Sequence, residues 1–117
     1  MSILTDYYNS NGIFLAQKVK NLIKKLNPEN NYIFKLKNID VNGQKRWCSG
    51  FITNPDTGNV VYLTTEYCTA GHFMYRFAEN DHDFRGRTNR WDGKNDFSVF
   101  GKKLVEALGQ TNARLMY

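Results

Sequence analysis

The residues of this chain that are best suited to binding chemistry lie in one run of seven, Arg85-Gly86-Arg87-Thr88-Asn89-Arg90-Trp91. An arginine guanidinium binds a phosphate through two parallel hydrogen bonds, and guanidinium and indole planes stack on unpaired bases. Glycine lets the backbone approach a ligand closely. The run therefore predicts a loop that binds phosphates and bases, and Arg76, the preceding arginine in the chain, is assigned to the same site.

The same part of the chain is rich in acids, which leaves a second interpretation open. Residues 75–94 contain five basic and four acidic residues, so their net charge is only +1. Asp81, Asp83 and Asp92 could pair with the arginines, and the segment would then be a self-paired structural loop. Which arginines are free is therefore a question of geometry.

A second candidate group, of four basic residues and one tryptophan, surrounds an expected hairpin at Asn42-Gly43. Its members are Lys35, Lys37, Lys45, Arg46 and Trp47. The basic residues could form a positive strip that follows a phosphate backbone, while Trp47 stacks on a base. Alternatively, such lysines discourage sheet edges from aggregating.

The expected strands carry many aromatic residues, and four-stranded sheets can present such rings to single-stranded bases. Rings at strand spacing are nevertheless more typical of a hydrophobic core. Trp47, Tyr32 and Tyr62 are the exceptions, because their polar tips tolerate exposure.

Catalytic and metal chemistry has less support in the sequence. The run Glu79-Asn80-Asp81-His82-Asp83 could hold a hard cation, as in a metal-dependent nuclease, but adjacent loop residues are more typical of a solvated acidic turn. Neither the two cysteines nor the two histidines have the spacing of a zinc site. We expect no catalytic residue, no metal and no cofactor.

Composition is consistent with a partner of opposite charge. The chain has 117 residues, a formal net charge of +5 and an isoelectric point near 9.3, and basic surfaces gain free energy by releasing counterions from nucleic acid. It contains no apolar run near the roughly 18 residues that cross a bilayer, and no secretory signal at its start. We therefore expect a cytoplasmic protein without membrane contact.

Helical periodicity occurs twice. Apolar residues at spacings of four, three and four predict a helix that begins near Ser10 and ends at Asn27-Pro28, because a residue before proline is disfavoured in a helix. A second stripe predicts a helix that Asn95-Asp96 caps and Gly109 ends. The apolar positions are Leu15, Val19, Leu22, Leu26, Phe97, Phe100, Leu104 and Leu108.

Alternation and turn signals predict four strands, the first containing residues 32–39 and the others at about 45–53, 59–66 and 71–78. Residues 79–94 have no sustained period and are predicted to form a long charged loop. Residues 1–9 are assigned to an N-terminal arm and 110–117 to a tail.

Turn length predicts how the strands pair. If Asn42-Gly43 forms a two-residue hairpin turn, Val41 lies opposite Gln44 and Phe34 lies opposite Phe51. At the next turn, Asn54 opposite Asn59 places Phe51 against Tyr62.

These patterns predict one α+β domain spanning residues 1–117, in the order α-β-β-β-β-α. In this fold, a four-stranded antiparallel meander has both helices packed on one face. We expect a small basic, non-enzymatic nucleic-acid-binding domain that contacts phosphates through the arginine-rich loop and stacks bases on Trp and Tyr. The alternative is a small adaptor or inhibitor, of the kind that phages and mobile elements encode, which binds a protein through the same loop. A metal-dependent nuclease is the third hypothesis.

Overall fold

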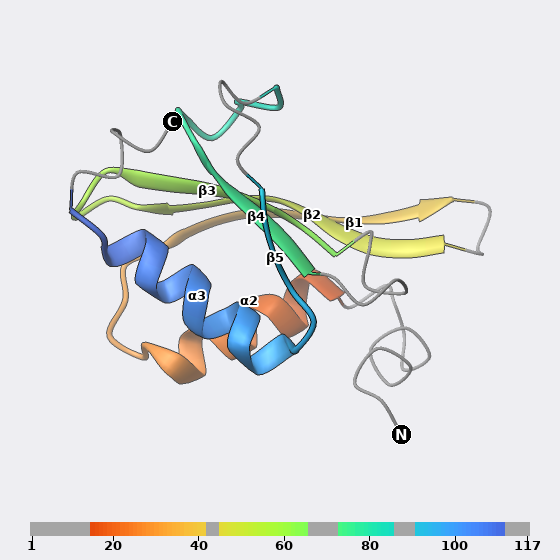
Figure 1. The fold of residues 1–117 in the computed structure, drawn as a ribbon, viewed down its shortest axis with the longest axis horizontal. Helices are drawn as coiled ribbons and strands as arrows, with labels where there is room; N and C mark the ends of the chain where they lie inside the picture. The colour runs from red at the N-terminus through yellow and green to blue at the C-terminus, as the bar shows by residue number, and fades with distance from the viewer. Residues whose placement is uncertain (1–14, 42–44, 66–72, 86–90, 112–117) are drawn as a thin grey trace.

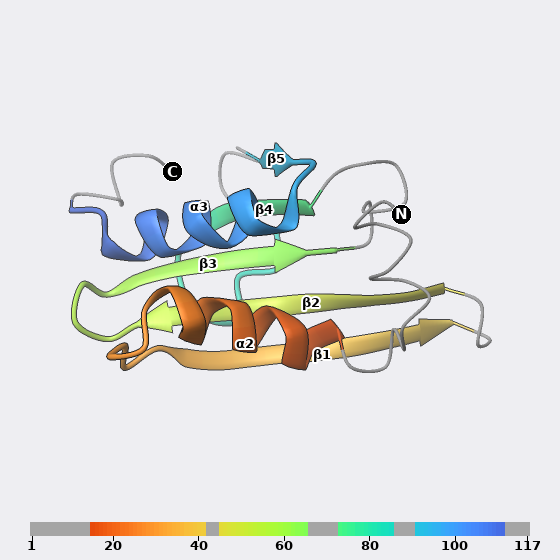
Figure 2. The same cartoon turned by 90° about the horizontal axis from the view of Figure 1, so that it is seen from below.

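The computed structural model describes residues 15–41, 45–65, 73–85 and 91–111, and in these the chain forms one antiparallel sheet with two helices on a single face (Figures 1 and 2). The strands lie in the order β1-β2-β3-β4-β5. The elements are α2 (Leu15–Leu26), β1 (Ile33–Val41), β2 (Lys45–Asn54), β3 (Asn59–Thr64), β4 (Phe73–Ala78), β5 (Asp92–Lys94) and α3 (Phe97–Gly109). The α+β class predicted from the sequence is confirmed.

The predicted number of strands is wrong by one. The three residues Asp92–Lys94, placed in the 79–94 loop by the sequence, form β5 and pair with residues 73–75 of β4. A three-residue strand containing Asp, Gly and Lys has no alternation of apolar and polar residues, so the pattern could not reveal it. The predicted arm 1–9 lies outside the described residues, as does the predicted tail beyond residue 111.

The hydrophobic core lies between the helices and the sheet. Figure 2 shows α2 and α3 side by side across the same face. Asp96 caps α3 by accepting a hydrogen bond from the backbone N–H of Val99 at 2.9 Å. The fully buried side chains of this core include Val19, Ile23, Ile52, Val61, Leu63, Phe73, Phe100, Leu104 and Leu108.

The register between β1 and β2 differs from the prediction by one residue. Val41 pairs with Lys45, so three residues connect the strands where a two-residue turn was predicted, and Lys35 takes the place opposite Phe51. Because side chains alternate along a strand, this shift places each side chain of β1 on the face of the sheet opposite to the one predicted. Phe34 and Leu36 pack against the helix-side core, and Lys35 and Lys37 are exposed.

The register between β2 and β3 is as predicted, with Asn54 opposite Asn59 and Phe51 opposite Tyr62. The turn between these strands also binds the C-terminal end of α3. The side-chain amide of Asn59 donates to the carbonyls of Ala107 at 3.0 Å and Leu108 at 3.1 Å. Asn54 and the Thr57 hydroxyl both donate to the Leu108 carbonyl. These donors satisfy helix-end carbonyls that have no partner within the helix.

A glycine sets the distance between the two helices. A Cβ built on the buried Gly101 of α3 would lie 2.5 Å from Leu22 Cδ2 and 2.8 Å from its Cγ. We expect Gly101→Ala to lower the free energy of unfolding by about 1 kcal/mol, because overpacking outweighs the gain in helix propensity.

The matched control is Gly109→Ala at the end of the same helix, where a Cβ would meet nothing within 4 Å. Its effect should be neutral or stabilising, by up to about 1 kcal/mol. Urea denaturation followed by circular dichroism compares the two variants. Equal effects would contradict close packing at Gly101.

Candidate nucleic-acid interface

The face of the sheet opposite the helices, called the open face below, carries a row of side chains that runs across four strands. Lys35 pairs with Phe51, Phe51 with Tyr62 and Tyr62 with Arg76, so the four residues lie side by side on β1 to β4. Figure 1 shows the segment that follows β4 on the side of the sheet away from α2 and α3. The row and this segment together form the candidate site.

Two exposed rings stand on this row. The Phe84 ring lies with its centroid 5.1 Å from that of Phe51 and 6.0 Å from that of Tyr62, both in edge-to-face geometry. Trp91 contacts Tyr62 in the same way at 5.8 Å. Phe84 is 66% exposed and Trp91 38% exposed. Large aromatic residues this exposed leave ring surface available to a ligand.

Arg76 is the centre of this arrangement. Its guanidinium carbon lies 4.7 Å from the centroid of Tyr62 and 5.4 Å from that of Trp91. Nη2 donates to the backbone carbonyl of Asp83 at 2.6 Å, and Nη1 lies 3.5 Å from the Asp83 carboxylate. The side chain is only 2% exposed. Arg76 therefore holds the rings in place and presents no charge to solvent.

Local turns position Phe84. The Asp83 carboxylate accepts a hydrogen bond from the backbone N–H of Glu79 at 3.0 Å, and the Asn80 side chain accepts one from the N–H of His82 at 3.0 Å. The N–H of Phe84 donates to the His82 carbonyl at 3.1 Å. These bonds fold residues 79–84 back onto the sheet.

Two acids of this segment, Asp81 and Asp83, have described partners other than Arg85. The Asp81 carboxylate lies 3.1 Å from the imidazole of His82 and 4.0 Å from the ammonium of Lys35, and both neighbours lower its pKa, the His82 hydrogen bond most. Asp83 contacts Arg76, as described above. Arg85 is exposed and makes no ion pair within the described part of the chain. Arg87 and Arg90 lie outside the described residues.

The predicted strip on β1 and β2 is placed in part. Lys35 is 55% exposed and donates to the Asp81 carbonyl at 3.1 Å, which ties β1 to the segment after β4. Lys37 is exposed two residues further along the strand. Lys45, Arg46 and Trp47 pair along the backbone with Val41, Asp40 and Ile39, and their side chains lie outside what the structure describes.

Sequence reasoning assigned no role to Phe84, the most exposed ring of the site. The available signal was a single large apolar residue in a charged segment, between Asp83 and Arg85. Such a residue belongs to no periodic stripe. It therefore has no expected place in a core, and exposure is the remaining possibility.

The acidic run at 79–83 does not assemble a metal centre: among the described residues, no three His, Cys, Asp or Glu side chains are grouped so that they could bind an ion. Neither described helix has the length and apolar character needed to cross a membrane. Fold and site together define an α+β domain with one helix-covered sheet face and one open aromatic face. No family model, curated protein or solved structure matches the chain.

Proposed function

We propose that this protein is a non-enzymatic domain that binds single-stranded nucleic acid on the open face of its sheet. The observation that carries the proposal is the pair of exposed rings, Phe84 and Trp91, fixed above Tyr62 by the buried Arg76. Stacking of a base on an aromatic side chain contributes about 1–3 kcal/mol. Rigid rings contribute more of this energy because little side-chain entropy is lost on binding.

The charges around the rings support the same partner. Lys35 and Lys37 are exposed on the same strand, with the Lys35 ammonium 4.0 Å from the Asp81 carboxylate, and Arg85 is exposed next to Phe84 in the chain. The whole chain carries a formal charge of +5. Cations beside stacking rings are the arrangement that non-specific single-strand binding requires, since the backbone and the bases are then held together. Duplex nucleic acid is a poorer fit, because its bases already stack on one another.

A protein partner is the second candidate, and a specific observation favours it. Ile33 is 57% exposed, and its strand position, two residues before Lys35, places it on the open face with the 66% exposed Phe84. Tryptophan and arginine are also the residues most often found at the energetic centres of protein interfaces. An adaptor or inhibitor with this face would bind through apolar contacts that hardly respond to salt.

Separate Phe84→Ala and Trp91→Ala substitutions test the proposal. We expect each to weaken binding of a fluorescein-labelled oligothymidylate about tenfold or more, because each removes one stacked base contact. Fluorescence anisotropy measures the affinity. The matched control is Val99→Ala, which shortens an apolar side chain that is 41% exposed on α3 and should leave binding unchanged.

The salt dependence of the wild-type protein completes this experiment. If Lys35, Lys37 and Arg85 neutralise three phosphates, the logarithm of the association constant should fall with the logarithm of salt concentration at a slope of about −2. Absence of binding even at low salt would remove the nucleic-acid proposal and leave the protein partner as the better one. Equal affinities for wild type and both ring variants would show that the open face is not the site.

A further inference from the structure

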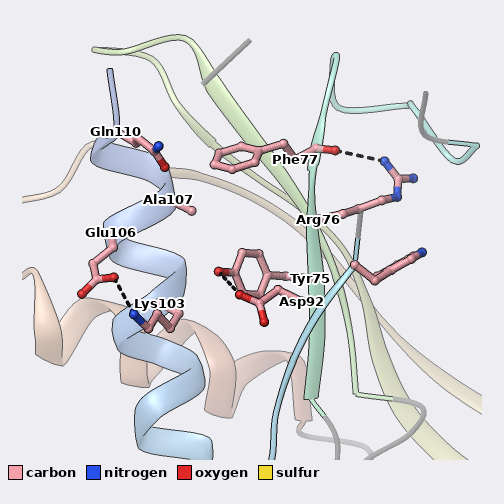
Figure 3. Close-up of a pocket in the computed structure, with 9 residues that line it drawn as sticks. Tyr75, Arg76, Phe77, Asp92, Lys103, Glu106, Ala107 and Gln110 are labelled. Carbon is pink, nitrogen blue, oxygen red and sulfur yellow. Dashed lines mark hydrogen bonds and ion pairs between the residues drawn. The ribbon is translucent and has the colours of Figure 1, made fainter. Parts of the chain in front are cut away.

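A cavity of about 410 Å³ lies beside the site, between the outer edge of β4 and α3. Figure 3 shows Tyr75 and Phe77 of β4 pointing toward α3, while Arg76 points the other way. Asp92 of β5 and Lys103, Glu106 and Ala107 of α3 complete much of the lining. The volume falls in the range of small-ligand pockets, roughly 300–1,000 Å³.

The Asp92 carboxylate in this cavity is held by two hydrogen bonds. The Tyr75 hydroxyl donates to its Oδ2 at 3.1 Å, and the Lys94 ammonium donates to its Oδ1 at 2.8 Å. Lys94, followed by the Tyr75 hydrogen bond, lowers the pKa of Asp92, while burial raises the pKa of the Tyr75 phenol. The carboxylate is thus ionised and fixed in orientation, and its side chain is still 47% exposed.

Each oxygen of this carboxylate accepts one described side-chain hydrogen bond and has capacity for another. The site therefore suits a group with two adjacent N–H donors. Among the four RNA bases, guanine alone presents two such donors side by side on its Watson–Crick edge, N1–H and the N2 amino group. The rings of Phe77 and Tyr75 supply aromatic surface for the flat base.

Trp91 belongs to both the cavity and the open face. Trp91 and Asp92 are neighbours in the chain, and Trp91 both contacts Tyr62 on the open face and lines the cavity. A strand with one base stacked on Trp91 can therefore turn over the edge of the sheet and place its next base in the cavity. Lys103 of the lining is 42% exposed and its ammonium lies 3.2 Å from the Glu106 carboxylate, so a phosphate would have to share this cation with Glu106.

We propose that this cavity receives one guanine base and that the Asp92 carboxylate binds its N1–H and N2 amino groups. The inference rests on the proposed function, because it gives a base preference to a domain that binds single strands. It is tested with mononucleotides, which can occupy the cavity without the open face.

The experiment titrates the protein with guanosine, adenosine, cytidine and uridine 5′-monophosphates and follows backbone amide shifts by NMR. We expect guanosine monophosphate to bind at least about tenfold more tightly than the other three, with shifts at Asp92 and Ala107. The N1-methylated guanosine monophosphate, which lacks one donor, should lose this advantage in the unmodified protein. This ligand control does not depend on the stability of any variant.

Asp92→Asn is the protein variant, because an amide keeps an acceptor for Tyr75 but replaces one carboxylate oxygen with a donor. It should abolish the preference for guanosine monophosphate. Asp56→Asn, at an exposed acid in the β2–β3 turn, is the matched control and should preserve it.

Equal binding of all four nucleotides, or an unchanged preference in Asp92→Asn, would overturn the cavity assignment. N-acetylarginine amide also presents adjacent N–H donors, and tighter binding of this probe than of guanosine monophosphate would overturn it in favour of a protein side chain. In either case, salt-dependent binding of oligothymidylate that needs Phe84 and Trp91 would leave the proposed function standing. Loss of oligothymidylate binding with the guanosine preference intact would contradict the open-face proposal alone.

Discussion

Replacement of Arg76 by methionine will lower the free energy of unfolding by about 3 kcal/mol and remove oligonucleotide binding. The Arg76 side chain is 2% exposed, and its guanidinium bonds to the Asp83 carbonyl and carboxylate and lies against Tyr62 and Trp91. Methionine fills a similar volume but donates no hydrogen bond. The largely buried Asp83 carboxylate then loses its ion pair with Arg76. Residues 79–84 also lose the hydrogen bond from Arg76 to the Asp83 carbonyl, which holds them against β4.

Chemical denaturation measures the stability change, and anisotropy with labelled oligothymidylate measures binding. For the stability measurement the matched control is Arg85→Met, since it removes the same charge from an exposed arginine and should change the free energy of unfolding by less than about 0.5 kcal/mol. Arg76→Lys keeps the charge but not the planar fork, so it should recover only part of both properties. A stable Arg76→Met protein that binds normally would show that Arg76 does not position the rings.

The second large effect is expected at the junction between the β2–β3 turn and α3. Asn59→Asp changes the side-chain size little, but it replaces the amide that donates to the Ala107 and Leu108 carbonyls with an acceptor. A carboxylate in this 7% exposed position would face carbonyl oxygens at the negative end of the helix. We expect the free energy of unfolding to fall by about 3 kcal/mol.

Thermal and urea unfolding of Asn59→Asp should be compared with Asn21→Asp. The latter makes the same chemical change at an exposed position of α2, where the side chain already accepts a hydrogen bond from Gln17 at 2.8 Å. Its stability should differ from wild type by less than about 0.5 kcal/mol. If Asn59→Asp were equally mild, the turn would not be needed to cap α3.

Local chemistry made much of the fold predictable. Asn54 to Gly58 is rich in turn-forming residues, so the β2–β3 register could be obtained from the sequence, and Asp96 was identified as a cap by its position before an apolar stripe. The β1–β2 register could not be obtained in this way. Both faces of β1 carry apolar residues, Ile33 on one and Phe34 on the other. The hydrophobic pattern therefore fits a two-residue and a three-residue connection equally well.

The sequence predicted where the site lies better than it predicted the role of each residue in it. The chain between Arg76 and Trp91 was recognised as the important region, but an arginine that binds phosphate and one that is buried between rings have the same local sequence. Only the packing of β3 against β4 places Tyr62 beside Arg76 and so gives the guanidinium an internal partner. The exposure of Phe84 follows from the same tertiary contacts.

The number of residues between β1 and β2 decides which face of the sheet carries the charges of Lys35 and Lys37. If one residue were lost from positions 42–44 and the connection kept its three residues, Val41 would pair with Arg46 in place of Lys45, and this shift of one residue would turn Lys35 and Lys37 toward the helices and Phe34 toward solvent. Short insertions and deletions at this position, which leave every amino acid of the strands unchanged, are therefore a route by which related genes could gain or lose a charged binding face.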